Sequence, residues 1–519
     1  MRYRPDIDGL RAVAILFVLI FHSGLKLFPS GFIGVDIFFV ISGFLITGII
    51  QDSLQNNQFS YIEFYSRRLW RLQPIFICLI ISTIVLTLVF YLPEDLVQYF
   101  KSARKTSLFI SNTYFARETT DYFASNNNQL PLLHTWSLSI EWQCYLILPI
   151  VIYFLYRIVD QRHILKVSFV LTLVFFALTT YCSVKDPMKN YYQLSSRIFE
   201  FLIGSCIVFS QDRLSFNKYF LNLINIIALI SLFYIATRHN INIGFPNLYA
   251  LILCSATAIL IASGRQNAES FATRLLSVKP LVFIGLLSYS LYIWHWPVFV
   301  LIHYLGIEES NTVLLFAFVL VFIISYFSWR FIEKPARQYN KIKFHYSLVY
   351  LFILPVAFIH VSDYLVKKYE GYPQRFTETA RIDTQLKQYA YSQRPLCLHD
   401  KSIEVNEHCV LGVKNSNSKT AFMFGDSYSN HFWGFMDSLA QEANLSVLAH
   451  SMAACLTLPG VSLYDWNTKV YTACQEQTER YYNMIRKNHY DFVILGQNWD
   501  GYLGGKFVTN EPVEQIKER

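Results

Sequence analysis

Long apolar stretches without charged residues recur along most of this chain, from Leu10 to Val366. A helix that crosses a bilayer needs about 20 such residues, because the hydrocarbon core contains no water to satisfy exposed backbone groups. Only 15% of the residues are charged, against about 25% in an average soluble domain. The sequence therefore predicts a multi-pass α-helical membrane bundle. It excludes a disordered tail, a collagen-like fibre, a small disulfide scaffold and an ordinary cytosolic enzyme.

We predict ten or eleven membrane spans, because the sixth of eleven apolar stretches is short. These stretches are Leu10–Phe28, Phe32–Ile50, Ile75–Leu92, Leu132–Tyr156, Ile164–Cys182, Ile198–Phe209, Tyr219–Ala236, Phe245–Ser263, Leu281–Tyr304, Thr312–Ile332 and Tyr346–Val366. Lysine and arginine are more frequent in the connections on the side of the N-terminus, which predicts a cytoplasmic N-terminus. Everything after Val366 would then lie outside the cytoplasm. The net charge of +8 thus reflects membrane orientation, and we expect no nucleic-acid partner.

From Lys367 the composition changes to that of a soluble domain. Three β-type runs, at Thr420–Phe424, Leu445–His450 and Asp491–Leu495, alternate with helical patterns. Such alternation is typical of an α/β domain with a parallel sheet. We therefore predict a membrane domain at 1–345, a further transmembrane helix at 346–366, a linker at 367–419 and an outer α/β domain at 420–519.

Cysteine usage agrees with this division. Four cysteines follow the last span, an even number that suits disulfides in an oxidising compartment. Four cysteines permit three pairings, and nearness in sequence favours Cys397–Cys409 and Cys455–Cys474.

Ionisable side chains inside the predicted spans are candidate functional residues, because each is costly in lipid unless it is paired or hydrated. Arg11 and His22 are eleven positions apart, which places them within roughly 20° of one helix face and ~16 Å apart along the axis. Glu141 is predicted at a similar depth to His22, where a carboxylate could orient the ring of a general base. The structural alternatives are a snorkelling arginine, a histidine bonded to a carbonyl group and a helix-terminal carboxylate.

Residues near the ends of two spans have both a binding and a structural interpretation. Arg68 and Arg71 share a helix face at i, i+3, where two guanidinium groups suit a phosphorylated ligand. Positive-inside anchoring is the alternative for this pair. Asp36 could contact a substrate, although it could equally cap the start of its helix.

Three other polar residues in or beside the spans favour structural roles. Arg197 and Glu200 are spaced as an i, i+3 ion pair, which we interpret as structural. His295 is flanked by Trp294 and Trp296, and aromatic neighbours are typical of the membrane–water interface. We therefore interpret His295 as an interfacial residue.

Two short motifs follow predicted strands of the outer domain, at the edge where parallel sheets carry their chemistry. A Gly-Asp-Ser motif ends at Ser427, which would be an exposed nucleophile at a strand-to-helix turn. A Gly-Gln-Asn motif ends at Asn498, whose side chain could donate to an oxyanion. A serine nucleophile also needs a base, but His431 is poorly placed and no histidine follows Asn498. A domain that binds glycan without hydrolytic chemistry is therefore an alternative.

Six further motifs follow one another along the predicted spans. They are Asp6-Ile-Asp-Gly-Leu-Arg11 with ten residues to His22, Gly31-Phe-Ile-Gly-Val-Asp36-Ile-Phe-Phe-Val-Ile-Ser-Gly-Phe-Leu-Ile-Thr47, Arg67-Arg-Leu-Trp-Arg71, His134-Thr-Trp-Ser-Leu-Ser-Ile-Glu141, Tyr289-Ser-Leu-Tyr-Ile-Trp-His-Trp-Pro297 and Ile332-Glu-Lys-Pro335. With these motifs the chain closely resembles the bacterial acyltransferase family 3, in the subgroup with a fused extracytoplasmic Ser-Gly-Asn-His hydrolase-type domain. The resemblance covers nearly the whole length.

This resemblance implies transfer of an acyl group, usually acetyl from cytoplasmic acetyl-CoA, to a hydroxyl group of an envelope glycan outside. We expect no metal. The residue roles that it implies are the catalytic His22 with Arg11 beside it, Arg68 and Arg71 near CoA, the membrane carboxylate Glu141, the nucleophile Ser427 and the oxyanion donor Asn498.

The chain departs from the family pattern in two places. Glu141-Trp-Gln-Cys-Tyr145 stands where family members often have Glu-Glu-Gln-Phe-Tyr, so a second acid is absent. The family's C-terminal Asp-x-x-His block does not occur before Arg519. We therefore expect the outer domain to be truncated.

The predicted function is a transmembrane O-acetyltransferase of the bacterial cytoplasmic membrane, with its C-terminal domain periplasmic or extracellular. The expected acceptor is lipopolysaccharide O-antigen or lipooligosaccharide, and peptidoglycan or an exopolysaccharide is the alternative. A glycan or lipid transporter is the alternative from another class, although no repeat between two halves supports it. A third hypothesis makes the outer domain an esterase or glycan-binding module and the membrane part its anchor.

Overall fold

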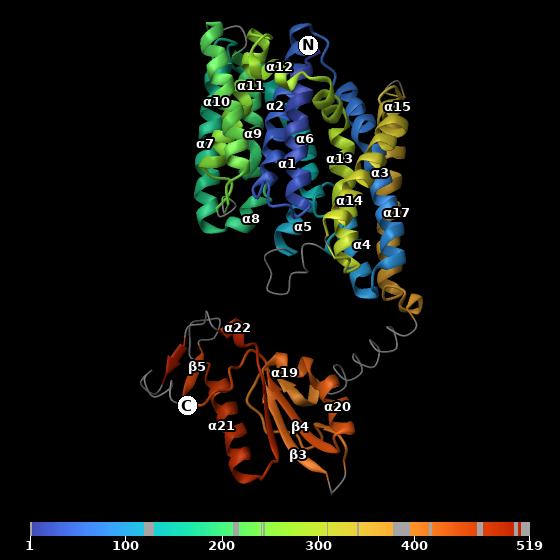
Figure 1. The fold of residues 1–519 in the computed structure, drawn as a ribbon, viewed down its shortest axis with the longest axis vertical. Helices are drawn as coiled ribbons and strands as arrows, with labels where there is room; N and C mark the ends of the chain where they lie inside the picture. Colours follow the sequence, from blue (N-terminus) through green and yellow to red (C-terminus); the bar gives the residue numbers. More distant parts are fainter. Residues whose placement is uncertain are drawn as a thin grey trace. The chain divides into compact units, whose positions relative to one another are not determined.

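The computed structural model describes residues 3–118, 129–210, 217–239, 241, 244–308, 310–339, 342–376, 395–414, 418–463, 471–502 and 507–509. The chain divides into two compact units, Met1–Tyr372 and Pro373–Arg519, each described here by itself (Figure 1). The first is helical and the second contains a parallel sheet. The predicted fold class is thereby confirmed.

The first unit is an assembly of helices. In chain order they are α1 (Pro5–His22), α2 (Gly34–Gln55), α3 (Tyr61–Phe90), α4 (Pro93–Ser107), α5 (Ser111–Glu118), α6 (Thr135–Ile158), α7 (Ile164–Lys185), α8 (Pro187–Tyr191), α9 (Leu194–Ser210), α10 (Lys218–Ala236), α11 (Leu248–Gln266), α12 (Phe271–Leu276), α13 (Lys279–Tyr304), α14 (Asn311–Ser328), α15 (Lys334–Ala336), α16 (Phe344–Leu348) and α17 (Leu354–Lys368). Two π-helical segments, Trp329–Glu333 and Val349–Ile353, join α14 to α15 and α16 to α17.

Nine helical segments among the described residues are long and apolar enough to cross a membrane, and each coincides with a predicted span. The first and sixth predicted spans are also helical. However, α1 carries Asp6, Asp8 and Arg11, and α9 has only 17 residues. α1 is therefore more charged, and α9 is shorter, than the nine helical segments that meet both criteria.

Glycines let the helices around the site approach closely. α1 packs against α13, and α2 packs against α9. A Cβ atom on Gly285 would lie 1.8 Å from the carbonyl oxygen of Asp8, and one on Gly43 would lie 2.1 Å from that of Phe201. Small residues at helix crossings are typical of membrane proteins, where close backbone packing drives association. The α1–α13 contact brings together the helices that carry the candidate site.

The structure differs from the sequence prediction between the third and fourth spans. The sequence predicts only a connection there, whereas α4 and α5 pack within the unit. α4 lies beside α17 (Figure 1), where Arg104 pairs with Asp363 at 3.3 Å. α5 packs against α6. The charged residues of α4 give it the composition of a loop, which explains why an apolar pattern does not reveal it.

The second unit contains a five-stranded sheet in the order β1-β4-β3-β6, with β2 antiparallel to β4. The central strand β3 pairs in parallel with both β4 and β6, and β5 pairs with β7 separately. The elements are β1 (Leu398–His399), β2 (Val410–Gly412), β3 (Lys419–Gly425), α19 (Ser427–His431), α20 (Trp433–Glu442), β4 (Leu445–Met452), β5 (Val461–Leu463), α21 (Thr472–Lys487), β6 (Phe492–Gly496), α22 (Trp499–Tyr502) and β7 (Phe507–Thr509).

Helices cover both faces of this sheet. α20 packs on the face that carries Ala421 and Met423, and Tyr481 of α21 packs on Phe422 and Phe424 of the other face. The predicted disulfides are both present: Cys397–Cys409 and Cys455–Cys474.

Candidate active site

Two histidines meet between α1 and α13. Nδ1 of His22, the last residue of α1, lies 3.0 Å from Nε2 of His295. Nδ1 of the fully buried His295 lies 3.1 Å from the carbonyl oxygen of Leu291. Because a carbonyl oxygen only accepts, a neutral His295 carries its proton on Nδ1 and accepts through Nε2. His22 then donates from Nδ1, which leaves the lone pair of its Nε2 for a reacting group.

Aromatic rings surround this histidine pair. The ring of Trp296 meets that of His22 edge-on, with 4.7 Å between centroids. The ring of His134, at the start of α6, lies 5.7 Å from that of His295. His134 is buried, and within the described residues neither of its ring nitrogens makes a well-aligned hydrogen bond. The rings therefore cover part of the pair, in which His295 is buried and His22 is half-buried.

A cavity of about 70 Å³ lies next to the histidine pair, between α1, α2, α3, α6 and α13. Tyr292 connects the cavity to the histidine pair, because it lines the cavity and its ring is 5.4 Å from that of His295. The polar residues of the lining are Arg11, Ser42, Arg71, Ser137, Glu141, Tyr145, Ser288, Tyr289 and Tyr292. Three candidates from three different helices thus share one cavity, which His22 does not line.

Glu141 is held by partners other than His22. One of its carboxylate oxygens accepts a hydrogen bond from Ser42 Oγ at 2.6 Å and another from the hydroxyl of Tyr145. The sequence predicts that this carboxylate orients the His22 ring, whereas in the structure His295 occupies that position. A catalytic role for Glu141 remains a prediction.

The three candidate arginines lie around the same cavity. Arg11 faces α13, as His22 does, and its Nη1 lies 3.1 Å from Asp8. Arg71 lines the cavity. Arg68 is buried beside it, with its guanidinium carbon 5.6 Å from the ring centroid of Tyr145. Nε of Arg68 has no hydrogen-bond partner within the described part of the chain, so this donor is available to an anion.

Asp36 lies in a buried ion cluster away from the cavity lining. Its carboxylate is 2.8 Å from Nη1 of Arg197, which is also 3.1 Å from Glu200. Three rings lie within 5.5 Å of the Arg197 guanidinium carbon, the closest being that of Tyr191 at 4.6 Å. The cluster ties α2 to α9. A substrate contact by Asp36 remains a prediction.

In the second unit, Asp426 brings the two predicted motifs together. Its carboxylate accepts hydrogen bonds from the backbone N–H of Asn498 at 3.1 Å and from the hydroxyl of Tyr502 at 2.8 Å. It also accepts one from the N–H of Tyr428 at 2.8 Å. Ser427 and Asn498 therefore lie at the same edge of the sheet, after β3 and β6.

The histidines of the second unit do not serve Ser427. His431 is exposed in α19, and Nδ1 of His450 lies 2.6 Å from the hydroxyl of Tyr481. Burial lowers the pKa of His450 to about 4, which keeps its ring neutral. Among the residues described for this unit, no hydrogen bond joins Ser427 to a histidine.

Residues 4–330 match the acyltransferase domain family, and residues 396–518 match the SGNH domain that is fused to AT3 domains. The chain belongs to acyltransferase family 3. No solved structure matches it. Within the described residues of this family member, no group of three or more His, Cys, Asp or Glu side chains could hold a metal ion.

Curated relatives of this family 3 chain include O-acetyltransferase OatA of Staphylococcus aureus, 34% identical over 355 residues. They also include peptidoglycan O-acetyltransferase OatA of Listeria monocytogenes, 33% identical over 352 residues, and putative peptidoglycan O-acetyltransferase YrhL of Bacillus subtilis, 34% identical over 359 residues. Each match covers 65% of this chain and 58%, 56% and 55% of the respective relative. The chain thus spans somewhat more than half the length of the relatives.

His295 is the residue of the site that the sequence interpretation missed. Its flanking tryptophans suggested an interfacial position, but Trp296 contacts His22 and His295 is fully buried. The available signal was a second histidine inside a predicted span. A histidine in lipid needs a polar partner, and His22 was the candidate.

Proposed function

We propose that this chain is a membrane O-acetyltransferase that moves acetyl from cytoplasmic acetyl-CoA to hydroxyl groups of an envelope glycan. The observation that carries the proposal is the contact between His22 and His295, which leaves Nε2 of His22 as a base. A cavity lined by two arginines and a carboxylate approaches this pair through Tyr292, whose ring is 5.4 Å from that of His295. The names of the relatives support O-acetyl transfer. Two of them are named for peptidoglycan, so we propose peptidoglycan as the acceptor in preference to lipopolysaccharide.

The proposed chemical step needs one base. Nε2 of His22 takes the proton of the acceptor hydroxyl while the hydroxyl oxygen attacks the thioester carbonyl. The carbon–sulfur bond then breaks, and the departing thiolate receives that proton. Arg11 lies ~16 Å from His22 along α1, so we propose that it and Arg71, which line the cavity, attract the anionic donor rather than contact the carbonyl oxygen. His295 keeps the His22 ring in the tautomer that this step requires.

The size of the cavity limits which part of the donor can enter. A volume of about 70 Å³ suits an acetyl thioester end, whereas the nucleotide end of CoA would have to lie outside it. Guanidinium groups bind phosphate oxygens in pairs. We therefore propose that Arg68 and Arg71 of α3 bind the phosphates of the donor.

The proposed orientation places the N-terminus in the cytoplasm and the second unit outside. The two disulfides support an oxidising compartment for this unit. There we propose Ser427 as the nucleophile that receives acetyl and passes it to the glycan, with Asn498 as the oxyanion donor. We propose 1–345 as the acyltransferase domain, 346–366 as a further span and 420–519 as the main part of the outer domain. Within the predicted linker 367–419, β1 and β2 already belong to the sheet of the outer domain.

Replacing His22 tests this function. We expect His22→Ala to abolish both thioester consumption in vesicles and acetyl esters on muramic acid, measured by mass spectrometry, at an unchanged protein level. His360→Ala is a matched control, because His360 also lies in a membrane helix and contacts a backbone carbonyl group, that of Val356, at 2.9 Å. Wild-type acetylation by the His22→Ala chain would refute the assignment. Glycan movement that needs no acetyl-CoA would instead support a transporter.

A further inference from the structure

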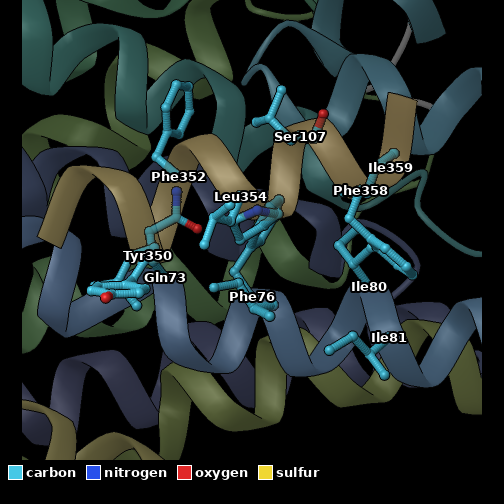
Figure 2. A pocket seen from close by; sticks show the side chains of 14 residues that line it. Gln73, Phe76, Ile80, Ile81, Ser107, Tyr350, Phe352, Leu354, Phe358 and Ile359 are labelled. Carbon is cyan, nitrogen blue, oxygen red and sulfur yellow. The ribbon is translucent and has the colours of Figure 1, made fainter. Parts of the chain in front are cut away.

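A second and larger cavity lies outside the candidate active site, between α3 and the π-helical turn that precedes α17 (Figure 2). Its volume is about 380 Å³, and hydrocarbon side chains such as Phe76, Ile80 and Ile359 form most of its wall. Leu354 and Phe358 at its rim are 51% and 56% exposed. Because α3 and α17 belong to membrane spans, this α3–α17 groove opens toward bilayer hydrocarbon rather than toward water.

One polar side chain inside the groove lacks a partner. Gln73 of α3 is 3% exposed and lines the groove, yet no described residue forms a hydrogen bond with its amide. In Figure 2 the amide group lies among Phe352 and Leu354. The other buried polar side chain of the lining, Ser107, is satisfied, because its hydroxyl donates to the carbonyl oxygen of Arg104 at 2.8 Å. An unpaired buried amide is costly, so the groove offers a hydrogen bond to whatever occupies it.

The backbone beside the groove is also irregular. Val349–Ile353 forms a π-helical turn, and Pro355 follows it within the first turn of α17. Proline provides no N–H for the preceding turn, and isolated π-helical turns within α-helices are often found at functional sites. The turn carries Tyr350 and Phe352, which line the groove.

We propose that the α3–α17 groove binds one acyl chain of a membrane phospholipid whose ester carbonyl oxygen accepts a hydrogen bond from the Gln73 amide. A volume of about 380 Å³ is of the size of one fatty-acyl chain. The ester is the group at the head of such a chain that accepts a hydrogen bond without bringing a charge into the groove. The site is separate from the histidine pair, and the proposal does not rest on the acetyltransferase activity.

Photo-crosslinking tests the proposal on the full chain in nanodiscs. The probes are two phospholipids with the same head group and the same diazirine-bearing chains, one with ester and one with ether linkages. After irradiation, mass spectrometry maps the adducts. We expect several-fold more adducts of the ester lipid on α3 and α17 than on the open face of α14, where Phe316 is 71% exposed. The ether lipid should label the groove several-fold less.

Two variants separate the hydrogen bond from the shape of the groove. Gln73→Leu keeps the side-chain volume but removes the amide, so the preference for the ester lipid should disappear while some labelling of α3 and α17 remains. Ile77 also lines the groove, so Ile77→Trp should fill it and reduce labelling by both lipids. Phe316→Trp places the same new ring on the open face of α14 and should leave labelling of the groove unchanged.

Two results would overturn the proposal. Labelling of α3 and α17 at the level of the α14 face would mean that only bulk lipid lies there. Equal labelling by the ester and ether lipids in the wild-type chain would refute the hydrogen bond from Gln73 and leave water as its partner. Thermal unfolding of each variant shows whether it is folded, and Gln73→Leu is not expected to lower the unfolding temperature.

Discussion

Replacing His295 by phenylalanine tests the central geometric inference. Phe keeps an aromatic ring in the buried position but removes the acceptor for Nδ1–H of His22, 3.0 Å away. A hydrogen bond contributes about 1 kcal/mol net, and a buried donor that is left unpaired costs about 1–3 kcal/mol. Since 1.36 kcal/mol corresponds to a factor of ten in rate, we expect the rate of acetyl transfer to fall about 10–100-fold.

The assay separates positioning from donor binding. Full-length chain in vesicles is supplied with a range of acetyl-CoA concentrations, and acetyl esters on the glycan are quantified. His295 does not line the cavity, so kcat should fall in His295→Phe while KM for the donor stays constant. His295→Gln supplies a carbonyl oxygen that can accept from His22, and we expect it to recover part of the lost rate.

A matched variant in α17 serves as the control. His360→Phe makes the same exchange in α17, where the histidine contacts only a backbone carbonyl group, and should leave the rate unchanged. If His295→Phe transferred acetyl at the wild-type rate, His295 would not set the tautomer of His22. If the Gln and Phe variants were equally slow, the ring of His295 would matter only for packing.

Three further predictions concern other parts of the chain. Arg71→Lys keeps the charge in the cavity but loses the planar fork, so KM for acetyl-CoA should rise about tenfold by steady-state kinetics. Gly285→Val would place a Cβ 1.8 Å from the Asp8 carbonyl oxygen, which should separate α1 from α13 and lower the Tm of the purified protein. Burial lowers the pKa of His450 to about 4, below the unfolded value of about 6.5. The second unit should therefore lose up to about 3 kcal/mol of stability between pH 6.5 and 4, and thermal unfolding of His450→Phe should lack this dependence.

The features of the fold that could be predicted are those carried by local patterns. Apolar stretches locate nine of the spans because a lipid-exposed helix must be apolar along a whole bilayer thickness. Alternating strands and helices locate the parallel sheet around β3. α4 could not be found in this way because only one of its faces is apolar: Leu96, Tyr99 and Phe100 pack into the core, whereas the charged residues of its other face lower its mean hydropathy. Such a helix has the hydropathy of a loop.

The candidate site was predictable only in part. Arg11 and Glu141 are ionisable residues in predicted spans, Arg71 precedes one, and all three line one cavity. The partner of His22 could not be predicted because it depends on the crossing of two helices 273 positions apart. The same holds for Asp36, whose partner Arg197 lies 161 positions away. Local spacing identifies a polar residue in lipid but not the helix that satisfies it.

Ion pairing distinguishes two kinds of buried charge in the membrane unit, although Nη2 of Arg197 also lacks a hydrogen-bond partner among the described residues. Asp36 and Arg197 form a short ion pair, with aromatic rings around the guanidinium group, which suits a role in holding α2 against α9. Arg68 has no ion-pair partner among the described residues, and its Nε is unpaired beside the cavity. Because a buried charge without a counter-charge is costly, such a group persists where a ligand supplies the opposite charge. The unpaired charge of Arg68 therefore favours an anion-binding cavity over a purely structural polar core.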